Sequence, residues 1–251
     1  MTEVSGNLTE RQMEDMRELQ AMRDEPLDPE LVDYIEESEQ WGKMLRHPLV
    51  YQIPLFTNGH ANRVLRQKQE IIAKAIEAED WASVIWMHER PYRLGALIDY
   101  IIGRDEDGDI ITLDPVTTSQ ETLDLVADVW VDSENIQQNI GDWRMLFGHA
   151  HGLWLGTEEE RAEFDALPKI EHKDGPLIHA WRGGSVGDWS WTTSQATAEF
   201  FARRSGLPVR GHQIPVSDVF GYLTRRSEQE LLVRFTEFRR DLVYPGGEPK
   251  C

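Results

Sequence analysis

Hydrophobic residues recur at helical spacing along much of the first 150 residues. Between residues 61 and 79 they stand at Val64, Leu65, Ile71, Ile72, Ala75 and Ile76, which is the period of one face of an α-helix. The pattern continues over residues 81–88 and 92–102. Thr118-Ser-Gln-Glu121 has the form of a capping box before a further apolar stripe, and a last helix is expected from about Glu134 to Phe147. We therefore expect residues 46–155 to form a helical domain.

The first 45 residues have a different, highly charged pattern. Thr9 to Gln12 again has capping-box form, and Asp28-Pro29-Glu30 is a typical helix start. These signals predict helices over residues 9–23 and 29–40. Because few apolar positions punctuate them, we expect an acidic helical arm that is loosely packed or partly disordered. The alternative is an acidic segment that docks on a basic partner.

After residues 156–174, a charged stretch that we take as the domain boundary, the pattern changes to short apolar runs. Leu177 to Trp181 is typical of a buried strand, and Leu231 to Phe235 of another. Between them Ser194 can cap a helix that Gly206 ends. Residues 170–245 should thus form a β core. The predicted fold class is α+β, with a helical N-terminal half and a mixed or antiparallel C-terminal sheet.

Composition narrows the functional classes. The 251 residues carry a net charge of −19. Residues 176–251 hold 10 Lys and Arg against 8 Asp and Glu, so the first 175 carry −21. An acidic chain binds phosphate backbones poorly, which makes nucleic acid an unexpected partner. No apolar run of eighteen residues and no secretory signal pattern is present, so we expect no membrane span and a cytoplasmic location.

Metal and disulfide chemistry are not expected either. The single cysteine is Cys251, so no intrachain disulfide can form. His149 and His151 could share one face of a strand, but no third ligand stands nearby in the sequence. We therefore predict no metal site.

Polar residues gather where the predicted elements of the β core end. Arg182 and Gly183 follow the first strand, Thr192-Thr193-Ser194 precede the helix, and Glu228 and Glu230 open the last strand. Residues two apart in a strand face the same side, so both glutamates should point into one cleft. One guanidinium, a hydroxyl cluster and two carboxylates are expected to converge at one edge of the sheet.

This order resembles the Arg–Ser/Thr–Glu signature of mono-ADP-ribosyltransferases, especially the compact bacterial and phage types, over roughly residues 176–236. The resemblance implies that NAD is the substrate and that Arg182 grips a phosphate, with Gly183 beside it. Thr192, supported by Thr193 and Ser194, would orient the glutamate or the nicotinamide ribose. Tryptophans such as Trp191 would offer a face to a ring. Glu230 would stabilise the charge that develops as nicotinamide leaves, and Glu228 would engage an arginine acceptor.

The sequence also departs from that family. Only ten positions separate Arg182 from Thr192, fewer than in the larger bacterial toxins, and the first hydroxyl is Thr rather than Ser. The expected function is transfer of ADP-ribose from NAD to a protein, with arginine as the acceptor, by a phage-encoded effector acting on a host protein. The alternatives are NAD hydrolysis and an inactive module that binds a partner through the acidic helical half.

Simpler structural interpretations stand beside these functional ones. Arg182 could be a salt-bridged strand end, Ser194 only a helix cap, Glu228 and Glu230 a solvated face, and the tryptophans core anchors. Gly183-Gly-Ser-Val-Gly187 also matches a nucleophile elbow. However, no helix signal follows the serine directly, and the later His212 precedes Asp218 rather than following it. We therefore do not expect a serine hydrolase built on this motif.

Overall fold

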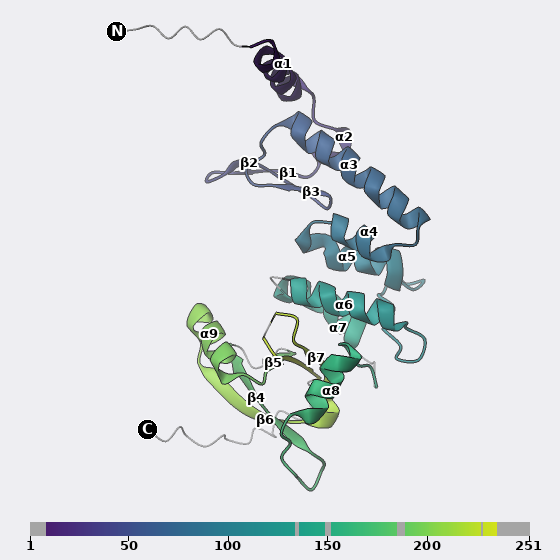
Figure 1. The fold of residues 1–251 in the computed structure, drawn as a ribbon, viewed down its shortest axis with the longest axis vertical. Helices are drawn as coiled ribbons and strands as arrows, with labels where there is room; N and C mark the ends of the chain where they lie inside the picture. The colour runs from purple at the N-terminus through teal and green to yellow at the C-terminus, as the bar shows by residue number, and fades with distance from the viewer. Residues whose placement is uncertain (1–8, 134–135, 149–151, 185–188, 227, 235–251) are drawn as a thin grey trace, which may run out of the picture. The chain divides into compact units, whose positions relative to one another are not determined.

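The computed structural model describes residues 9–133, 136–148, 152–184, 189–226 and 228–234, which form an α+β fold (Figure 1). The α+β class predicted from the sequence is confirmed. The chain divides into two compact units, Met1–Ile101 and Ile102–Cys251. The stretch at 156–174, predicted as a boundary, lies inside the second unit. His149, His151, Ser185 and the start of the helix predicted from Glu134 lie outside the described residues.

The first unit contains seven helical segments and a three-stranded sheet within its described residues. They are α1 (Glu10–Asp24), α2 (Pro29–Val32), β1 (Ile35–Ser38), β2 (Gly42–His47), β3 (Val50–Gln52), α3 (Asn58–Glu77), α4 (Trp81–Met87), η1 (Arg90–Tyr92), α5 (Arg93–Leu97) and η2 (Ile98–Ile102). The strands run antiparallel in the order β1-β2-β3. Leu31, Leu45, Leu65 and Val84 form the centre of its core.

The helix predicted over residues 29–40 is wrong beyond Val32. Asp28 does cap a helix there, since its side chain accepts from the Glu30 N–H, but that helix has only four residues. Ile35 then pairs with Leu45 across a hairpin, and it packs against the core of the unit. Gly42 closes the hairpin with a φ of 68°, a conformation that glycine adopts without strain. Pairing within this hairpin, together with burial of Ile35, overrides the local helix signal here, and the N-terminal half is not purely helical.

The second unit begins with helices, most of them where the hydrophobic pattern predicts them. They are α6 (Gln120–Asp132), η3 (Ile136–Asn139), α7 (Ile140–Phe147) and α8 (Glu158–Ala166). Ser119 caps α6 by accepting from the Thr122 N–H, one position after the predicted start of the capping box. Phe164 of α8 lies 6.0 Å from Tyr222, measured between ring centroids. This packing explains why the predicted boundary region belongs to the second unit.

A five-stranded antiparallel sheet follows, in the order β6-β4-β5-β8-β7. Its strands are β4 (Leu177–Gly183), β5 (Ser190–Thr192), β6 (Val209–Pro215), β7 (Val219–Leu223) and β8 (Glu230–Val233). Within the described chain, two helices stand between the strands, α9 (Gln195–Ser205) before β6 and η4 (Val216–Asp218) before β7. The strand predicted at Leu177, the strand opened by Glu230 and the helix capped by Ser194 are all confirmed. Gly206 ends α9 with a φ of 70°.

The closeness of α9 and β4 depends on Gly183. A Cβ atom at this position would collide with the backbone of Ala198 and Ala202 on α9. Figure 1 shows α9 lying alongside β4. The glycine therefore allows the helix to pack directly on the strand that carries Arg182.

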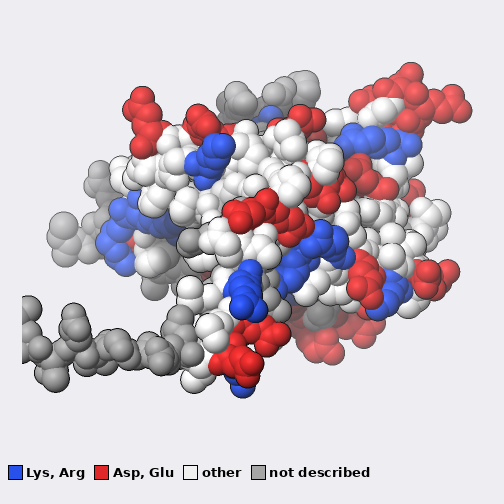
Figure 2. All heavy atoms as spheres, turned by 90° about the horizontal axis from the view of Figure 1, so that it is seen from above, with Lys and Arg blue, Asp and Glu red and all other residues white. Residues whose placement is uncertain are grey.

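Charged side chains are spread over the face of the molecule that Figure 2 displays, with Lys and Arg interspersed among the more numerous Asp and Glu. None of the helices that the structure describes is both long enough and apolar enough to cross a membrane.

Candidate functional site

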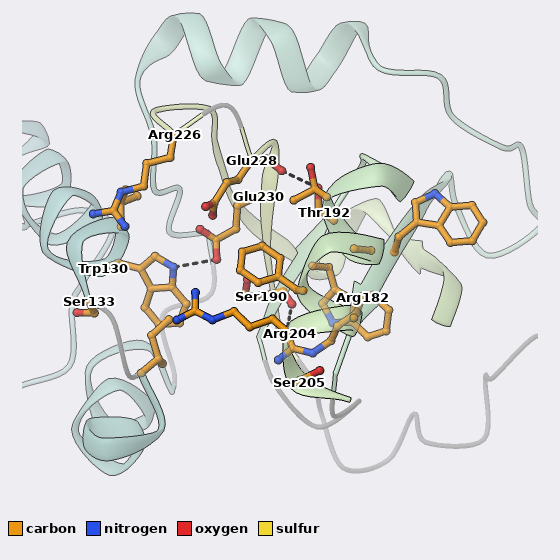
Figure 3. A pocket seen from close by; sticks show the side chains of 18 residues that line it. Trp130, Ser133, Arg182, Ser190, Thr192, Arg204, Ser205, Arg226, Glu228 and Glu230 are labelled. Carbon is orange, nitrogen blue, oxygen red and sulfur yellow. Dashed lines mark hydrogen bonds between the residues drawn. The ribbon is translucent and has the colours of Figure 1, made fainter. Parts of the chain in front are cut away.

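A pocket of about 770 Å³ opens in the second unit (Figure 3). Its walls come from α6, η3, β4, β5, α9, the connection between β7 and β8, and the first residue of β8. The lining residues are Trp130, Val131, Ser133, Ile136, Trp181, Arg182, Gly183, Ser190, Trp191, Thr192, Thr197, Ala198, Phe201, Arg204, Ser205, Arg226, Glu228 and Glu230. The pocket thus combines three guanidinium groups, two carboxylates, several hydroxyls and four large aromatic rings.

Glu230 is the first residue of β8 and pairs with Thr192 on β5. The indole Nε1–H of Trp130 donates a hydrogen bond to Glu230 Oε1 over 3.1 Å. Burial raises the pKa of Glu230 above its ordinary value, and the negative charge of Glu228 raises it further. Hydrogen bonds from Ser190 and Trp130 and the positive charge of Arg182 act in the opposite direction and lower this pKa. Glu230 is half-buried and held by hydrogen-bond donors, an arrangement that suits a carboxylate to stabilising a nearby positive charge.

Glu228 reaches the same pocket by a route that strand alternation does not describe. Gln229 has a φ of 49°, and β8 begins only at Glu230. The Glu228 carbonyl accepts a hydrogen bond from Thr192 Oγ1 over 2.6 Å. The expected convergence of the two glutamates is present, but a turn beside Thr192 produces it rather than a pleated strand.

Arg182 stands near the end of β4, where its Nη1 donates to the backbone carbonyl of Ser190. Its guanidinium lines the pocket and contributes positive charge near Glu230. Arg226 enters from the β7–β8 connection, and its Nη2 lies 3.5 Å from Asp132 Oδ1. Arg204 enters from the last turn of α9. The pocket is therefore richer in positive charge than the chain around it.

The three hydroxyl residues Thr192, Thr193 and Ser194 do not share one role, because only the first of them lines the pocket. Thr192 is buried and lines the pocket, where its Oγ1 accepts from the Ser194 N–H at 3.1 Å. Thr193 and Ser194 are not among the lining residues. Thr193 Oγ1 donates to the Gln229 side chain over 3.1 Å, and Ser194 Oγ accepts from the Thr197 N–H over 3.2 Å. Their observed contacts fix the Glu228–Glu230 turn and cap α9.

Trp191 serves both the core and the pocket. It is 2 % exposed, packs in the core cluster of the sheet and meets His212 edge-on at 5.0 Å. Only a small part of its ring can face a ligand. The neighbouring Trp181 pairs with Thr192 across the sheet and is more exposed, which makes it the more accessible ring of the two.

Sequence reasoning missed several of the lining residues. The apolar stripe that follows Glu121 includes Trp130 only as a core position, and the sequence pattern gives no role to Arg204, Arg226 or Ser190. For Trp130 one signal existed: a buried indole N–H needs an acceptor, so a tryptophan on a buried helix face predicts a polar partner. Nothing in the sequence says that this partner is a glutamate one hundred positions later.

Comparison of the chain with protein-family models, with curated proteins and with solved structures found no match to any of them. Within the described part of the chain, no three His, Cys, Asp or Glu side chains are grouped so that they could hold a metal ion. The site must therefore be interpreted from its own geometry.

Proposed function

We propose that the pocket binds NAD and that the protein transfers ADP-ribose from it to an arginine side chain of another protein. One observation carries the proposal. Arg182, Thr192 and Glu230 lie on three neighbouring strands, β4, β5 and β8, and line one pocket. The sequence resemblance to mono-ADP-ribosyltransferases rested on their order alone, and this adjacency in space is an independent support for it.

The composition of the pocket suits a dinucleotide. Its volume of about 770 Å³ falls within the range of roughly 300–1,000 Å³ that is typical of ligand sites. Guanidinium groups bind phosphate oxygens with a planar fork of donors, so Arg182 and Arg204 are suited to the pyrophosphate. Trp181 and Phe201 offer aromatic surface to a flat ring.

The two carboxylates that line the pocket, Glu228 and Glu230, suit cleavage of the nicotinamide–ribose bond. When this C–N bond breaks, its electron pair leaves with nicotinamide and positive charge develops on the ribose carbon. Glu230, ionised and preorganised, stabilises that charge. A guanidinium nitrogen of the acceptor then forms the new C–N bond, and Glu228 takes the proton that it releases. Atoms and charge balance without a metal or a redox partner.

The test combines labelled NAD with a lysate of a bacterial host and compares wild type with Glu230→Gln. The substitution keeps the size of the side chain and removes its charge. We expect the rate of nicotinamide release to fall by about a hundredfold to a thousandfold, the usual cost of one preorganised electrostatic group. Glu199→Gln is the matched control, because Glu199 lies on α9 and is not among the lining residues.

Glu228→Gln separates transfer from cleavage. We expect this variant to release nicotinamide but to label arginine acceptors weakly. A wild type that releases nicotinamide and labels no protein would indicate NAD hydrolysis. If wild-type protein binds no NAD and releases no nicotinamide, the proposal is wrong and the partner-binding alternative gains weight.

A further inference from the structure

Trp130 connects the helical part of the second unit to the carboxylate at the centre of the pocket. It lies on α6, is 2 % exposed and donates its indole N–H to Glu230 Oε1 at 3.1 Å. Figure 3 shows the ring on the wall opposite the strands, with its nitrogen directed at the carboxylate. The bond joins the helix to the first residue of β8.

The indole is held by an aromatic cluster that spans helices and sheet. Its ring lies 5.0 Å from Trp143 at 76° and 5.8 Å from Phe147, both on α7. Phe147 in turn contacts Trp189 at 5.6 Å and Phe220 at 5.2 Å, next to β5 and on β7. Buried aromatic pairs of this kind restrict the ring to one orientation. The N–H therefore points at a fixed place.

The backbone of α6 is anchored to the connection that carries Glu228. Arg225 donates to the Asp124 carbonyl at 3.2 Å and pairs with the Asp128 carboxylate. The next residue, Arg226, lies 3.5 Å from Asp132. The helix thus holds the connection at two further points, and Trp130 adds the third contact at Glu230 itself.

Resting on the proposed function, we propose that Trp130 is a positioning residue, whose indole N–H fixes the Glu230 carboxylate toward the substrate and favours its ionised form. An indole N–H can only donate, so it bonds best to a charged carboxylate oxygen. A serine hydroxyl such as Ser190 can donate or accept, so it serves either protonation state. Trp130 therefore selects the charged state that catalysis requires.

Other groups around Glu230 also influence the protonation of its carboxylate. Burial and the negative charge of Glu228 raise its pKa, and Arg182 lowers it. Arg204 and Arg226 also line the pocket. The Trp130 bond works with these cations and against burial, so its loss should move the pKa of Glu230 upward.

The experiment compares Trp130→Phe with Trp143→Phe. Both substitutions keep an aromatic ring in the same buried cluster. The Trp143 Nε1–H has no hydrogen-bond partner among the described residues, so its loss breaks no bond to Glu230. The Glu230 side chain is titrated by NMR of ¹³C-labelled glutamate carboxyls, with Glu230→Gln identifying its signal, and circular dichroism checks that each variant is folded.

We expect the pKa of Glu230 to rise in Trp130→Phe and to stay unchanged in Trp143→Phe. The acid limb of nicotinamide release should move to higher pH, and kcat should fall about ten- to a hundredfold, the usual effect of a hydrogen bond to a charged group. The KM for NAD should change little. An unchanged Glu230 titration in folded Trp130→Phe, or an equal shift in both variants, overturns the inference. The titration needs no turnover, so it decides the role of Trp130 even if wild-type protein does not cleave NAD and the proposed function fails.

Discussion

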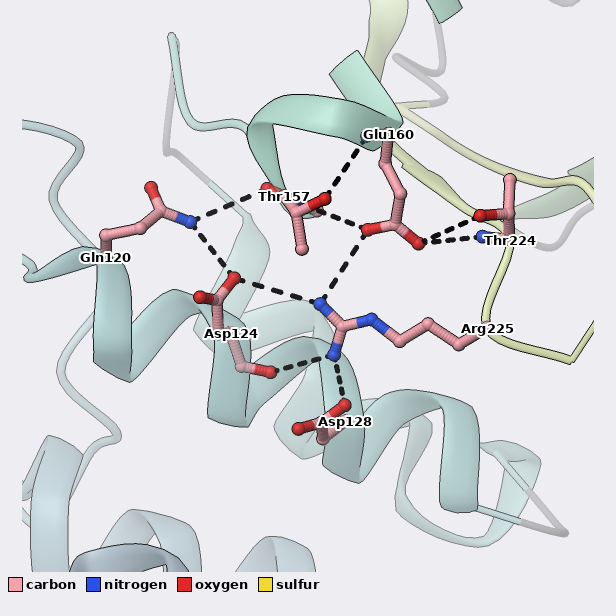
Figure 4. Close-up of polar contacts among 8 residues, drawn as sticks. Gln120, Asp124, Asp128, Thr157, Glu160, Thr224 and Arg225 are labelled. Carbon is pink, nitrogen blue, oxygen red and sulfur yellow. Dashed lines mark hydrogen bonds and ion pairs between the residues drawn. The ribbon is translucent and has the colours of Figure 1, made fainter. Parts of the chain in front are cut away.

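Glu160 is the residue whose loss should most clearly loosen the support of the candidate site. It is only 4 % exposed and stands in the first turn of α8 (Figure 4). Its Oε2 accepts from the Thr157 N–H over 2.9 Å and lies 3.7 Å from Arg225 Nη2, while its Oε1 accepts from the Thr224 N–H over 2.8 Å. One carboxylate thus joins α8 to the start of the β7–β8 connection.

The loss of stability expected in Glu160→Gln follows from these contacts. In Glu160→Gln one amide oxygen remains, so one of the two backbone N–H groups loses its acceptor and the other keeps a neutral one. Each charge-assisted bond contributes about 1.5–3 kcal/mol. Arg225 retains Asp124 and Asp128, so it is not left as an unpaired buried charge. We therefore expect the free energy of unfolding of the second unit to fall by roughly 2–4 kcal/mol.

Glu158→Gln is the matched control. It removes a charge from the same helix turn, but Glu158 is exposed, so only the helix-dipole contribution of about 0.3–1 kcal/mol is lost. Because the chain has two compact units, the assay is hydrogen exchange of peptides from α8 and β7 at increasing urea, which reports on the second unit alone. Equal opening free energies in the two variants would refute the reasoning.

Two further predictions concern the ligand and the first unit. Arg204→Ala should weaken NAD binding about tenfold, the lower end for a charged hydrogen bond at an exposed position. Arg203 lies on the same helix turn but outside the pocket, so Arg203→Ala should leave the calorimetric Kd for NAD unchanged. Equal losses of affinity in the two variants would contradict a role for Arg204 in binding NAD. Burial lowers the pKa of both His47 and His88 from the ordinary value of 6.5. The unfolded chain then takes up protons first, so the stability of the first unit is complete above about pH 6.5 and declines as the pH falls through the lowered values. Hydrogen exchange in β2 and α4 that is equally slow at pH 8 and pH 5, after correction for intrinsic rates, would contradict this.

Local signals were sufficient to predict several elements of the second unit. Ser194 caps α9 and Gly206 ends it as predicted, and the cap of α6 lies at Ser119, one position after the predicted Thr118. These signals act over three or four residues, so the sequence alone displays them. The order of Arg182, Thr192 and Glu230 likewise needed no structure to be recognised.

Strand pairing in the first unit could not be predicted in the same way. Residues 35–38 carry two glutamates and a serine with a single apolar Ile35, and no local pattern distinguishes this segment from the end of a charged helix. It becomes a strand because β2 offers it backbone partners and a buried surface. Such pairing depends on the partner strand and on the core against which the hairpin packs, which the propensity of residues 35–38 does not describe.

The sequence by itself indicated the helices that became α6 and α7, the strands that begin at Leu177 and Glu230, and the polar residues at their ends, but it did not indicate α8 or the strands β5, β6 and β7. Only the tertiary structure decided that Thr192 faces the pocket while Ser194 caps a helix, and that Trp130 meets Glu230. The reason is physical. Capping and periodicity are settled between neighbours in the chain, whereas a buried carboxylate takes its partners from whatever elements the packing brings against it.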